Sequence, residues 1–190
     1  LYVTEPRAIA VLDAASGALR RAIPIAATPI GLAADARTRH LFVTALPPGT
    51  MPASAYSLLA TVDATSGAAL HQVRFATSSE SPDSAIVAVD GPRGHLFVSS
   101  NISMMNMVDT RTGAVLASAP TDPLPQLGAV AERAGRVFVA NLNFGEQGGR
   151  PGQAQGSLSA FDAATGVVSN RRAIDSGAGR YYGVEFSPGR

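Results

Sequence analysis

Short stretches in which apolar side chains recur at every second position run along the whole chain, and turn residues separate them. One such stretch spans residues 57–62, and a second spans residues 68–75 after a tight bend. A period of two places the apolar side chains on one face of a β-strand. No segment of ten or more residues combines helical periodicity with capping residues. The pattern therefore predicts an all-β protein built from short strands.

Two motifs recur along the chain. The first is a triplet of apolar and aromatic residues, and the second is a turn of the form Asp-x-x-Ser/Thr-Gly. The triplets are Leu1-Tyr2-Val3, Leu41-Phe42-Val43, Leu96-Phe97-Val98 and Val137-Phe138-Val139, and the turns span residues 13–17, 63–67, 109–113 and 162–166. The turn Asp residues stand 50, 46 and 53 positions apart. This period lies in the range of β-propeller blades.

The turn motif has a physical explanation. The Asp carboxylate accepts hydrogen bonds from backbone N–H groups ahead of it, the Ser or Thr adds a similar bond, and Gly adopts a positive φ without steric cost. A further strand and turn precede each of the last three triplets. The pattern therefore predicts four strands in each repeat. In the second repeat the expected strands span residues 30–35, 41–46, 57–63 and 68–75.

The chain is thus predicted to be a single β-propeller segment of four-stranded antiparallel blades over residues 1–190. The repeats span residues 1–27, 28–76, 84–119 and 127–175, and residues 183–190 begin a further blade. A seven-strand sandwich is the alternative fold. It does not explain why the same turn returns four times downstream of the same triplet.

The repeat resembles the YVTN repeat of the YncE-like family and of some microbial surface-layer proteins. Leu1-Tyr2-Val3-Thr4 and Val137-Phe138-Val139-Ala140-Asn141 carry the resemblance, and the turns continue it. Glu5, Ala45 and Ser100 stand where the family usually has Asn. The resemblance implies a propeller, commonly seven-bladed and commonly exported, so that the protein is expected in the periplasm, outside the cell or on the cell surface.

An arc of about four blades leaves two apolar faces and one strand edge open. The open faces and edge could be covered by missing blades, by a second copy of the chain, or by pairing of residues 184–186 with the strand at residues 1–4. We favour missing blades. The usual ring of the family needs more than four repeats.

Composition removes several function classes. The chain has 190 residues, 15 Lys and Arg against 14 Asp and Glu, and no Cys. All the basic residues are Arg, so a Schiff-base Lys and the Lys of a phosphate-binding loop are absent, as are thiol nucleophiles and thiolate metal ligands. The charge balance gives no electrostatic footprint for nucleic acid, and no apolar run is long enough to span a membrane.

The candidate site lies on the face formed by the connections between second and third strands and between blades, where propeller ligands usually bind. The second-to-third connections at residues 45–56 and 141–156 are the long ones. The candidate ligand-binding residues on this face are Glu80, Asp83, Asp122, Asn141, Asn143, Glu146, Arg180 and Tyr181. The same residues are also typical of a solvated loop surface.

No metal site and no cofactor are predicted. His40 and His95 directly precede triplets, so they are expected to be turn residues on the opposite face, and His71 stands alone in an outer strand. The turns lack the pattern and the terminal Glu of a calcium loop. Met104, Met105 and Met107 are expected to fill the core.

The leading hypothesis is a non-catalytic extracytoplasmic scaffold that binds an unknown ligand or protein on the loop face. Two alternatives remain at this point. One is part of a propeller enzyme, such as a metal-dependent sugar-lactone hydrolase using Glu80, Asp83, Asp122 and Glu146, or a quinone- or haem-linked dehydrogenase subunit. The other is a structural surface-layer segment.

Overall fold

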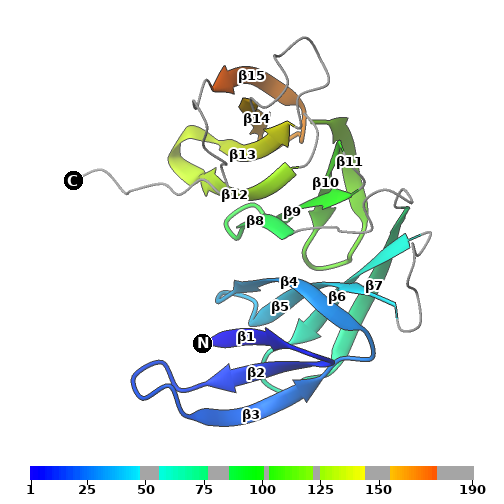
Figure 1. The fold of residues 1–190 in the computed structure, drawn as a ribbon, viewed down its shortest axis with the longest axis vertical. Helices are drawn as coiled ribbons and strands as arrows, with labels where there is room; N and C mark the ends of the chain where they lie inside the picture. Colours follow the sequence, from blue (N-terminus) through cyan, green and yellow to red (C-terminus); the bar gives the residue numbers. More distant parts are fainter. Residues whose placement is uncertain (48–55, 77–85, 101–102, 122–124, 144–154, 175–190) are drawn as a thin grey trace. The chain divides into compact units, whose positions relative to one another are not determined.

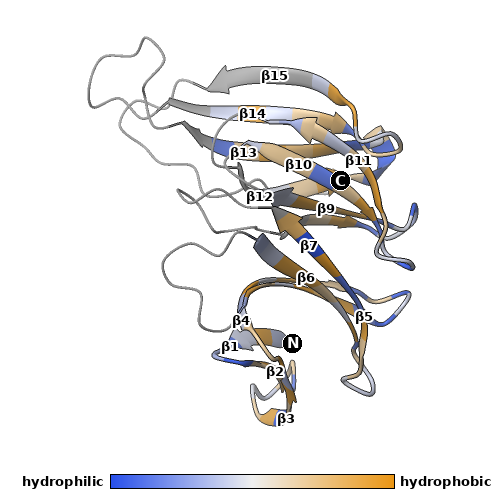
Figure 2. Ribbon diagram, turned by 90° about the vertical axis from the view of Figure 1, so that its right-hand side faces the viewer, coloured by the Kyte–Doolittle hydropathy of each residue, from blue (hydrophilic) through white to orange (hydrophobic). Residues whose placement is uncertain are grey.

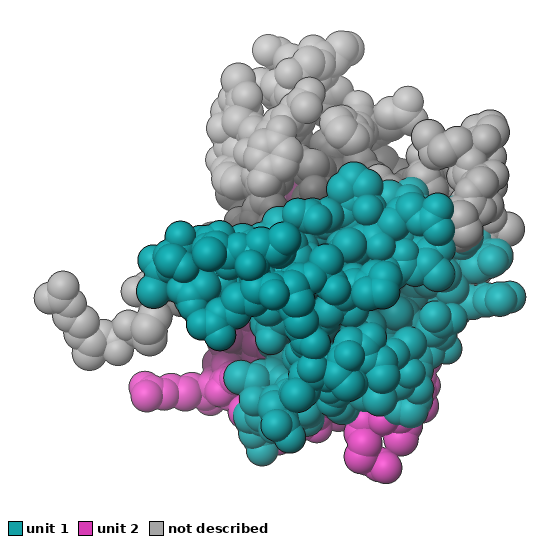
Figure 3. Space-filling model, turned by 90° about the horizontal axis from the view of Figure 1, so that it is seen from below, with its two compact units in different colours: residues 1–86 teal, residues 87–190 magenta. Residues whose placement is uncertain are grey.

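The structure is a computed structural model that describes residues 1–47, 56–76, 86–100, 103–121, 125–143 and 155–174. These residues form fifteen β-strands and one short 3-10 turn (Figure 1). The chain divides into two compact units, residues 1–86 and residues 87–190, which Figure 3 colours separately. Within the described residues no helix is long and apolar enough to cross a membrane.

The first unit contains two antiparallel sheets. Sheet one has three strands in the order β1-β2-β3, and sheet two has four strands in the order β4-β5-β6-β7. The strands of sheet one are β1 (Tyr2–Glu5), β2 (Ala8–Leu12) and β3 (Leu19–Pro24). Those of sheet two are β4 (Thr28–Asp35), β5 (His40–Leu46), β6 (Tyr56–Asp63) and β7 (Ala69–Ala76).

The second unit also contains two antiparallel sheets, each of four strands in sequence order. Sheet three comprises β8 (Ile86–Asp90), β9 (His95–Ser100), β10 (Met104–Asp109) and β11 (Val115–Pro120). Sheet four comprises β12 (Pro125–Ala131), β13 (Arg136–Asn143), β14 (Gln155–Asp162) and β15 (Val168–Ile174). The 3-10 turn η1 (Glu132–Ala134) joins β12 to β13.

The all-β prediction is confirmed. The four strands of sheet two begin and end within two residues of the expected bounds. The four sheets span residues 2–24, 28–76, 86–120 and 125–174, so that sheet three ends one residue after the expected repeat and sheet four begins two residues before it. The inclusion of all repeats in a single propeller segment stays a prediction, and residues 183–190 lie outside the described residues.

Each unit has an apolar core between its two sheets. In the first unit the core contains Ile9, Ile23, Leu41, Val43, Ala60 and Val62. In the second it contains Phe97, Met105, Met107, Val137, Val139, Phe161 and Ala163, so the prediction that Met105 and Met107 fill the core is confirmed. Figure 2 shows the hydrophobic colouring along the strands and hydrophilic colouring at the turns. Residues of the last three triplets thus contribute to the apolar faces that hold neighbouring sheets together.

The last two strands of every sheet share one irregularity. The register shifts once, between Val11 and Leu12, Thr61 and Val62, Met107 and Val108, or Ala160 and Phe161. Each shift lies one or two residues before the turn Asp. A bulge at this point increases the local twist and sets the angle at which the chain enters the turn.

Candidate functional site

The two ends of each sheet carry different connections. In sheet two the β5–β6 connection spans residues 47–55, whereas β4–β5 and β6–β7 are joined by the short segments 36–39 and 64–68. Sheet four repeats this arrangement, with a long connection at 144–154 and a short one at 163–167. Because neighbouring strands are antiparallel, successive connections leave a sheet at opposite ends. We call these the loop end and the turn end.

The Asp-x-x-Ser/Thr-Gly motif closes the turn end by the expected hydrogen bonds. The Asp13 Oδ1 atom accepts from the Ala15 N–H at 3.0 Å, from the Ser16 N–H at 2.8 Å and from the Ser16 hydroxyl at 2.9 Å. The same three bonds form at the turn carboxylates Asp63, Asp109 and Asp162. The Gly that ends each turn has a φ between 71° and 81°.

These hydrogen bonds lower the pKa of every turn carboxyl. At Asp13 the Ser16 N–H, the Arg20 guanidinium and the Ser16 hydroxyl hold the pKa at about 2. The pKa values of Asp63 and Asp162 are lowered mainly by the backbone N–H of the fourth turn residue, and that of Asp109 mainly by the Thr112 hydroxyl. Each carboxylate is therefore ionised at neutral pH and is used by its own turn.

Side chains at the turn end also join neighbouring sheets. The imidazole Nδ1 of His95, at the start of β9, lies 2.8 Å from the carbonyl oxygen of Ala163 in sheet four. In the first unit the Arg21 guanidinium of β3 donates to the carbonyl oxygen of Ala64 in sheet two. Ala64 and Ala163 both directly follow their turn Asp. The same carbonyl in two different turns is thus the acceptor for the preceding sheet.

His40 and His95 therefore lie at the turn end, each as the first residue of its strand and not within the turn where it was expected. His40 is the first residue of β5, in the position that His95 has in β9. Its Nδ1 atom is buried and makes no hydrogen bond within the described part of the chain. Among those residues no three His, Asp or Glu side chains are grouped as a metal site would require.

A cavity of about 340 Å³ lies at the turn end of the first unit, where the sequence predicted only structural turns. Its lining includes Tyr2, Asp35, Arg39 and His40. The buried Asp35 carboxylate accepts from the Thr38 hydroxyl at 3.0 Å and from the Arg37 N–H at 2.9 Å. The carboxylate thus holds the β4–β5 turn in place. The sequence could not identify Tyr2 and Arg39 as lining residues, because the cavity forms between segments that are far apart in the sequence.

Asn141, one of the predicted ligand-binding residues, lies in β13 near the loop end and is fully buried. Its amide oxygen accepts from the Thr121 hydroxyl at 2.8 Å. Its amide nitrogen is 3.0 Å from the Ser159 hydroxyl and 3.3 Å from the Ser157 hydroxyl. Both ends of the amide are used inside the protein, so Asn141 pins three chain segments together at this end. Its expected contact with a ligand stays a prediction that would require these bonds to exchange.

Sheet three carries a similar polar cluster near its loop end. The buried Asn106 amide donates to the Ser100 hydroxyl at 2.6 Å and accepts from the Ser118 hydroxyl at 2.7 Å. The three residues lie on β9, β10 and β11. Satisfied buried polar groups fix the relative positions of the strands that carry them. The loop ends of sheets three and four therefore have hydrogen-bonded bases.

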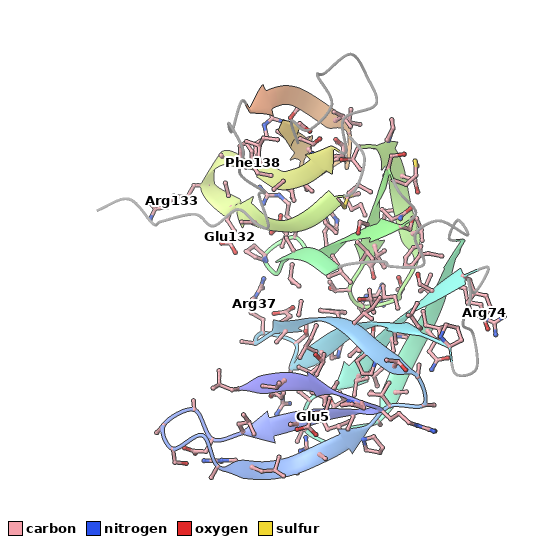
Figure 4. The ribbon with its side chains drawn as sticks, in the orientation of Figure 1. Glu5, Arg37, Arg74, Glu132, Arg133 and Phe138 are labelled. Carbon is pink, nitrogen blue, oxygen red and sulfur yellow. The ribbon has the colours of Figure 1, made fainter. Side chains whose placement is uncertain are left out.

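The remaining predicted site residues cannot be placed against these clusters. Asn143 is the last residue of β13, and only its backbone is described. The others, Glu80, Asp83, Asp122, Glu146, Arg180 and Tyr181, lie outside the described residues. The Arg74 guanidinium lies over the Tyr56 ring, 4.8 Å from the ring centroid. Figure 4 shows the side chains that are placed and labels Arg74.

No protein-family model and no curated protein sequence matches the chain. Solved structures do match it. A hydrazine synthase from Kuenenia stuttgartiensis is 15% identical with a TM-score of 0.64, and the match covers 89% of this chain and 44% of that one. BamB from Moraxella catarrhalis is 17% identical with a TM-score of 0.59, over 90% of this chain and 44% of that one. The computationally designed Ika8 protein is 12% identical with a TM-score of 0.61, over 98% and 52%.

The described strands form four antiparallel sheets in tandem, and the chain matches these solved structures over most of its length. The fold is a β-propeller. Each sheet is one blade, and the turn end and the loop end are the two ends of a blade. The chain spans about half the length of the solved chains it matches. At 12–17% identity the likeness establishes the fold, and the function has to be argued from the residues of this chain.

Proposed function

We propose that the chain is a non-catalytic β-propeller scaffold that binds a ligand or a protein partner at its loop end. The observation that carries this proposal is the difference between the two ends of the blades. Short turns close one end, and the Asp side chain of each turn accepts hydrogen bonds from the backbone of the same turn. The other end carries the long connections 47–55 and 144–154, and hydrogen bonds of Asn141 fix the strand ends beside the second of these. Variable loops on a rigid base are the usual design of a binding surface.

The composition of the proposed surface favours a polar polypeptide as its ligand. The predicted residues combine the acidic groups Glu80, Asp83, Asp122 and Glu146 with Arg180 and Tyr181. Tyr and Arg are enriched among the residues that dominate binding energy at protein interfaces. Carboxylates and a guanidinium on the same surface can pair with both kinds of charge along a peptide.

An array of synthetic peptides probed with the purified chain tests this proposal. Glu146→Ala combined with Tyr181→Ala is expected to weaken the captured signals at least about tenfold, the effect of losing one strong contact. Arg20→Ala is the matched control, because Arg20 pairs with Asp13 at a turn end and is exposed. Equal loss in both variants, or capture that neither variant changes, would contradict binding at the loop end.

Titration calorimetry with calcium tests the non-catalytic part of the proposal. The metal-dependent hydrolase alternative needs Glu80, Asp83, Asp122 and Glu146 to converge on a divalent ion. The scaffold proposal predicts no binding heat and no thermal shift with calcium. Binding heat that disappears in Glu80→Gln and in Asp122→Asn would replace the scaffold with the hydrolase.

We also assign the chain to the YVTN-repeat, YncE-like class and to an extracytoplasmic location. The fourfold triplet and the identical hydrogen bonding of all four turns support the class assignment. The location follows from the resemblance alone. Fractionation of the source cells with an antibody against the chain tests it, and recovery of the protein with cytoplasmic markers would refute it.

A further inference from the structure

A Tyr and an Arg form a contact pair at the loop end of the second blade. Tyr56 is the first residue of β6, and Arg74 lies two residues before the end of β7. The strand register places Tyr56 opposite Ala76 and Leu58 opposite Arg74. Tyr56 and Arg74 are therefore diagonal neighbours on one face of sheet two, a separation that an aromatic ring and a long side chain can bridge.

This pair continues the apolar face of β6 out to solvent. Ala60 and Val62 belong to the core of the first unit, and the alternation of side chains puts Tyr56 on the same face of the strand. Ala60 is buried, Tyr56 is half-buried and Arg74 is exposed. Figure 4 shows the Arg74 side chain at the outer side of the first unit. The guanidinium is therefore accessible to a ligand at the loop end.

Arg74 differs from the arginines that form ion pairs. Within the described residues these pairs all lie at turn ends, and they are Arg20–Asp13, Arg93–Asp90 and Arg136–Asp162. In the same part of the chain the Arg74 guanidinium has neither an acidic partner nor a hydrogen-bond acceptor. Asp63 is the one acidic residue of β6 and β7, and its carboxylate is used by its own turn at the opposite end of the blade.

The ring contact prepares Arg74 for binding. The Arg74 Cζ atom lies 4.8 Å from the centroid of the Tyr56 ring, within the range of a cation–π interaction. This interaction uses no hydrogen-bond donor, so the five N–H donors of the guanidinium remain available. The ring also restrains a side chain that otherwise has many rotamers. Restraint before binding lowers the entropic cost of forming the complex.

The available donors fit a carboxylate. A guanidinium and a carboxylate form two parallel N–H···O hydrogen bonds, which fix the orientation of both groups. Arg74 is the one Arg of β6 and β7, whereas phosphorylated peptides are typically bound by clusters of Arg. A single guanidinium balances the single charge of an Asp or Glu side chain. The chemistry of the pair therefore favours an acidic residue over a phosphorylated one.

We propose that Arg74, held by the Tyr56 ring, binds the carboxylate of an Asp or Glu side chain in the polypeptide ligand of the loop end. This inference rests on the proposed function and adds a sequence preference to it. Neither residue is among those that the sequence pointed to as ligand-binding. The guanidinium supplies the hydrogen bonds and the charge, and the ring keeps the guanidinium in position.

A peptide array in which every sequence is present in an acidic and a neutral form tests the proposal. Asn and Gln replace Asp and Glu in the neutral form. The unmodified chain is expected to capture the acidic forms about tenfold more strongly, the effect of one charge-assisted contact. Arg74→Gln is expected to bring the ratio of the two signals to about one. Arg111→Gln is the matched control, because it removes an exposed Arg at a turn end and is expected to keep the ratio.

Two further comparisons separate the roles of ring, charge and planar fork. Tyr56→Leu is expected to reduce the ratio, and Tyr56→Phe, which restores the ring, is expected to recover it. Arg74→Lys keeps the charge without the fork and is expected to recover less than half of the preference. Circular dichroism of each variant checks that the β-structure is retained. Phosphoserine forms of the same peptides are included, and stronger capture of these than of the Glu forms would overturn the assignment to a carboxylate.

The outcomes distinguish this inference from the proposed function. A ratio near one in the unmodified chain, a ratio that Arg74→Gln leaves unchanged, or an equal loss in Arg111→Gln overturns the carboxylate site. Each of these results is compatible with a loop end whose capture falls in Glu146→Ala combined with Tyr181→Ala. Capture that this double variant leaves unchanged overturns the proposed function instead, whatever the ratio in Arg74→Gln.

Discussion

The imidazole Nδ1 of His95 and the carbonyl oxygen of Ala163 lie 2.8 Å apart, and this contact joins two blades across 68 positions of sequence. A side chain at the start of one triplet strand thus forms a hydrogen bond with the backbone of the turn in the next blade. The Arg21 contact with Ala64 has the same acceptor position in the first unit. Contacts of this kind make a tandem array of sheets cooperative.

Removal of the His95 contact is expected to destabilise the second unit. His95→Ala leaves the Ala163 carbonyl without this donor, and a broken, partly buried hydrogen bond costs about 1–2 kcal/mol. Urea denaturation followed by circular dichroism measures the change. His71→Ala is the control, because His71 is a half-buried residue of the outer strand β7 and is expected to cost less. Equal losses in the two variants would show that the contact contributes nothing specific.

The turn glycines form a matched pair of positions for testing close packing between blades. Gly17 and Gly166 both have a φ of 71°. A Cβ on Gly17 meets no atom within 4 Å, whereas a Cβ on Gly166 lies 3.0 Å from the Ala117 Cβ and 3.3 Å from the Met107 Cβ. Ala at either position adopts a strained φ at a cost of about 1 kcal/mol. Gly166→Ala adds steric overlap of about 1–3 kcal/mol.

Urea denaturation of the two glycine variants measures this difference. The expected order of the unfolding free energies is unmodified chain, Gly17→Ala, then Gly166→Ala. If Gly17→Ala is as costly as Gly166→Ala, the approach of the turn to the preceding blade is not what selects glycine at position 166.

Arg39 occupies a position where glycine is preferable. It has a φ of 59°, and the residues in the same place before β9 and β13 are Gly94 and Gly135, with φ values of 69° and 60°. Arg39→Gly is expected to stabilise the first unit by about 0.5–1 kcal/mol because glycine removes the backbone strain. Arg39→Ala removes the same charge and keeps the Cβ, so it is expected to bring no gain. A thermal melt of both variants decides whether the backbone or the charge matters.

The four turn carboxyls predict the pH dependence of stability. Their pKa values are lowered in the folded protein below the ordinary value of 3.8, to about 2 at Asp13. A group whose pKa falls on folding contributes stability above the unfolded value, and this contribution is lost as the pH falls through the folded value. Stability is therefore expected to decline between about pH 4 and pH 2.

Urea midpoints from pH 6 to pH 2 test this expectation. Asp162→Asn removes one titrating carboxyl and is expected to make the decline shallower, at the cost of lower stability at pH 6. An Asp162→Asn curve parallel to that of the unmodified chain over the acidic range would contradict a role for the turn carboxylates.

Much of the fold could be predicted because its signals are local. The alternation of apolar residues placed the strands of sheet two within two residues, and the turn motif formed the hydrogen bonds that its residue types predicted. The candidate site stays a prediction. Asn141 was expected on the loop face, and its side chain is buried there and bonded to Thr121, Ser157 and Ser159. The cavity beside Tyr2 and Arg39 had no sequence signal at all.

The sequence by itself determined the repeat, the strands of each blade and the conformation of the turns, because these depend on hydrogen bonds and alternation within a few residues. Only the tertiary structure decided that a Cβ at position 166 would meet the preceding blade while one at position 17 would meet no atom within 4 Å, and that His95 reaches Ala163. These differences arise between segments tens of residues apart, where packing depends on which blade is the neighbour. Identical motifs therefore acquire different roles according to their place in the array.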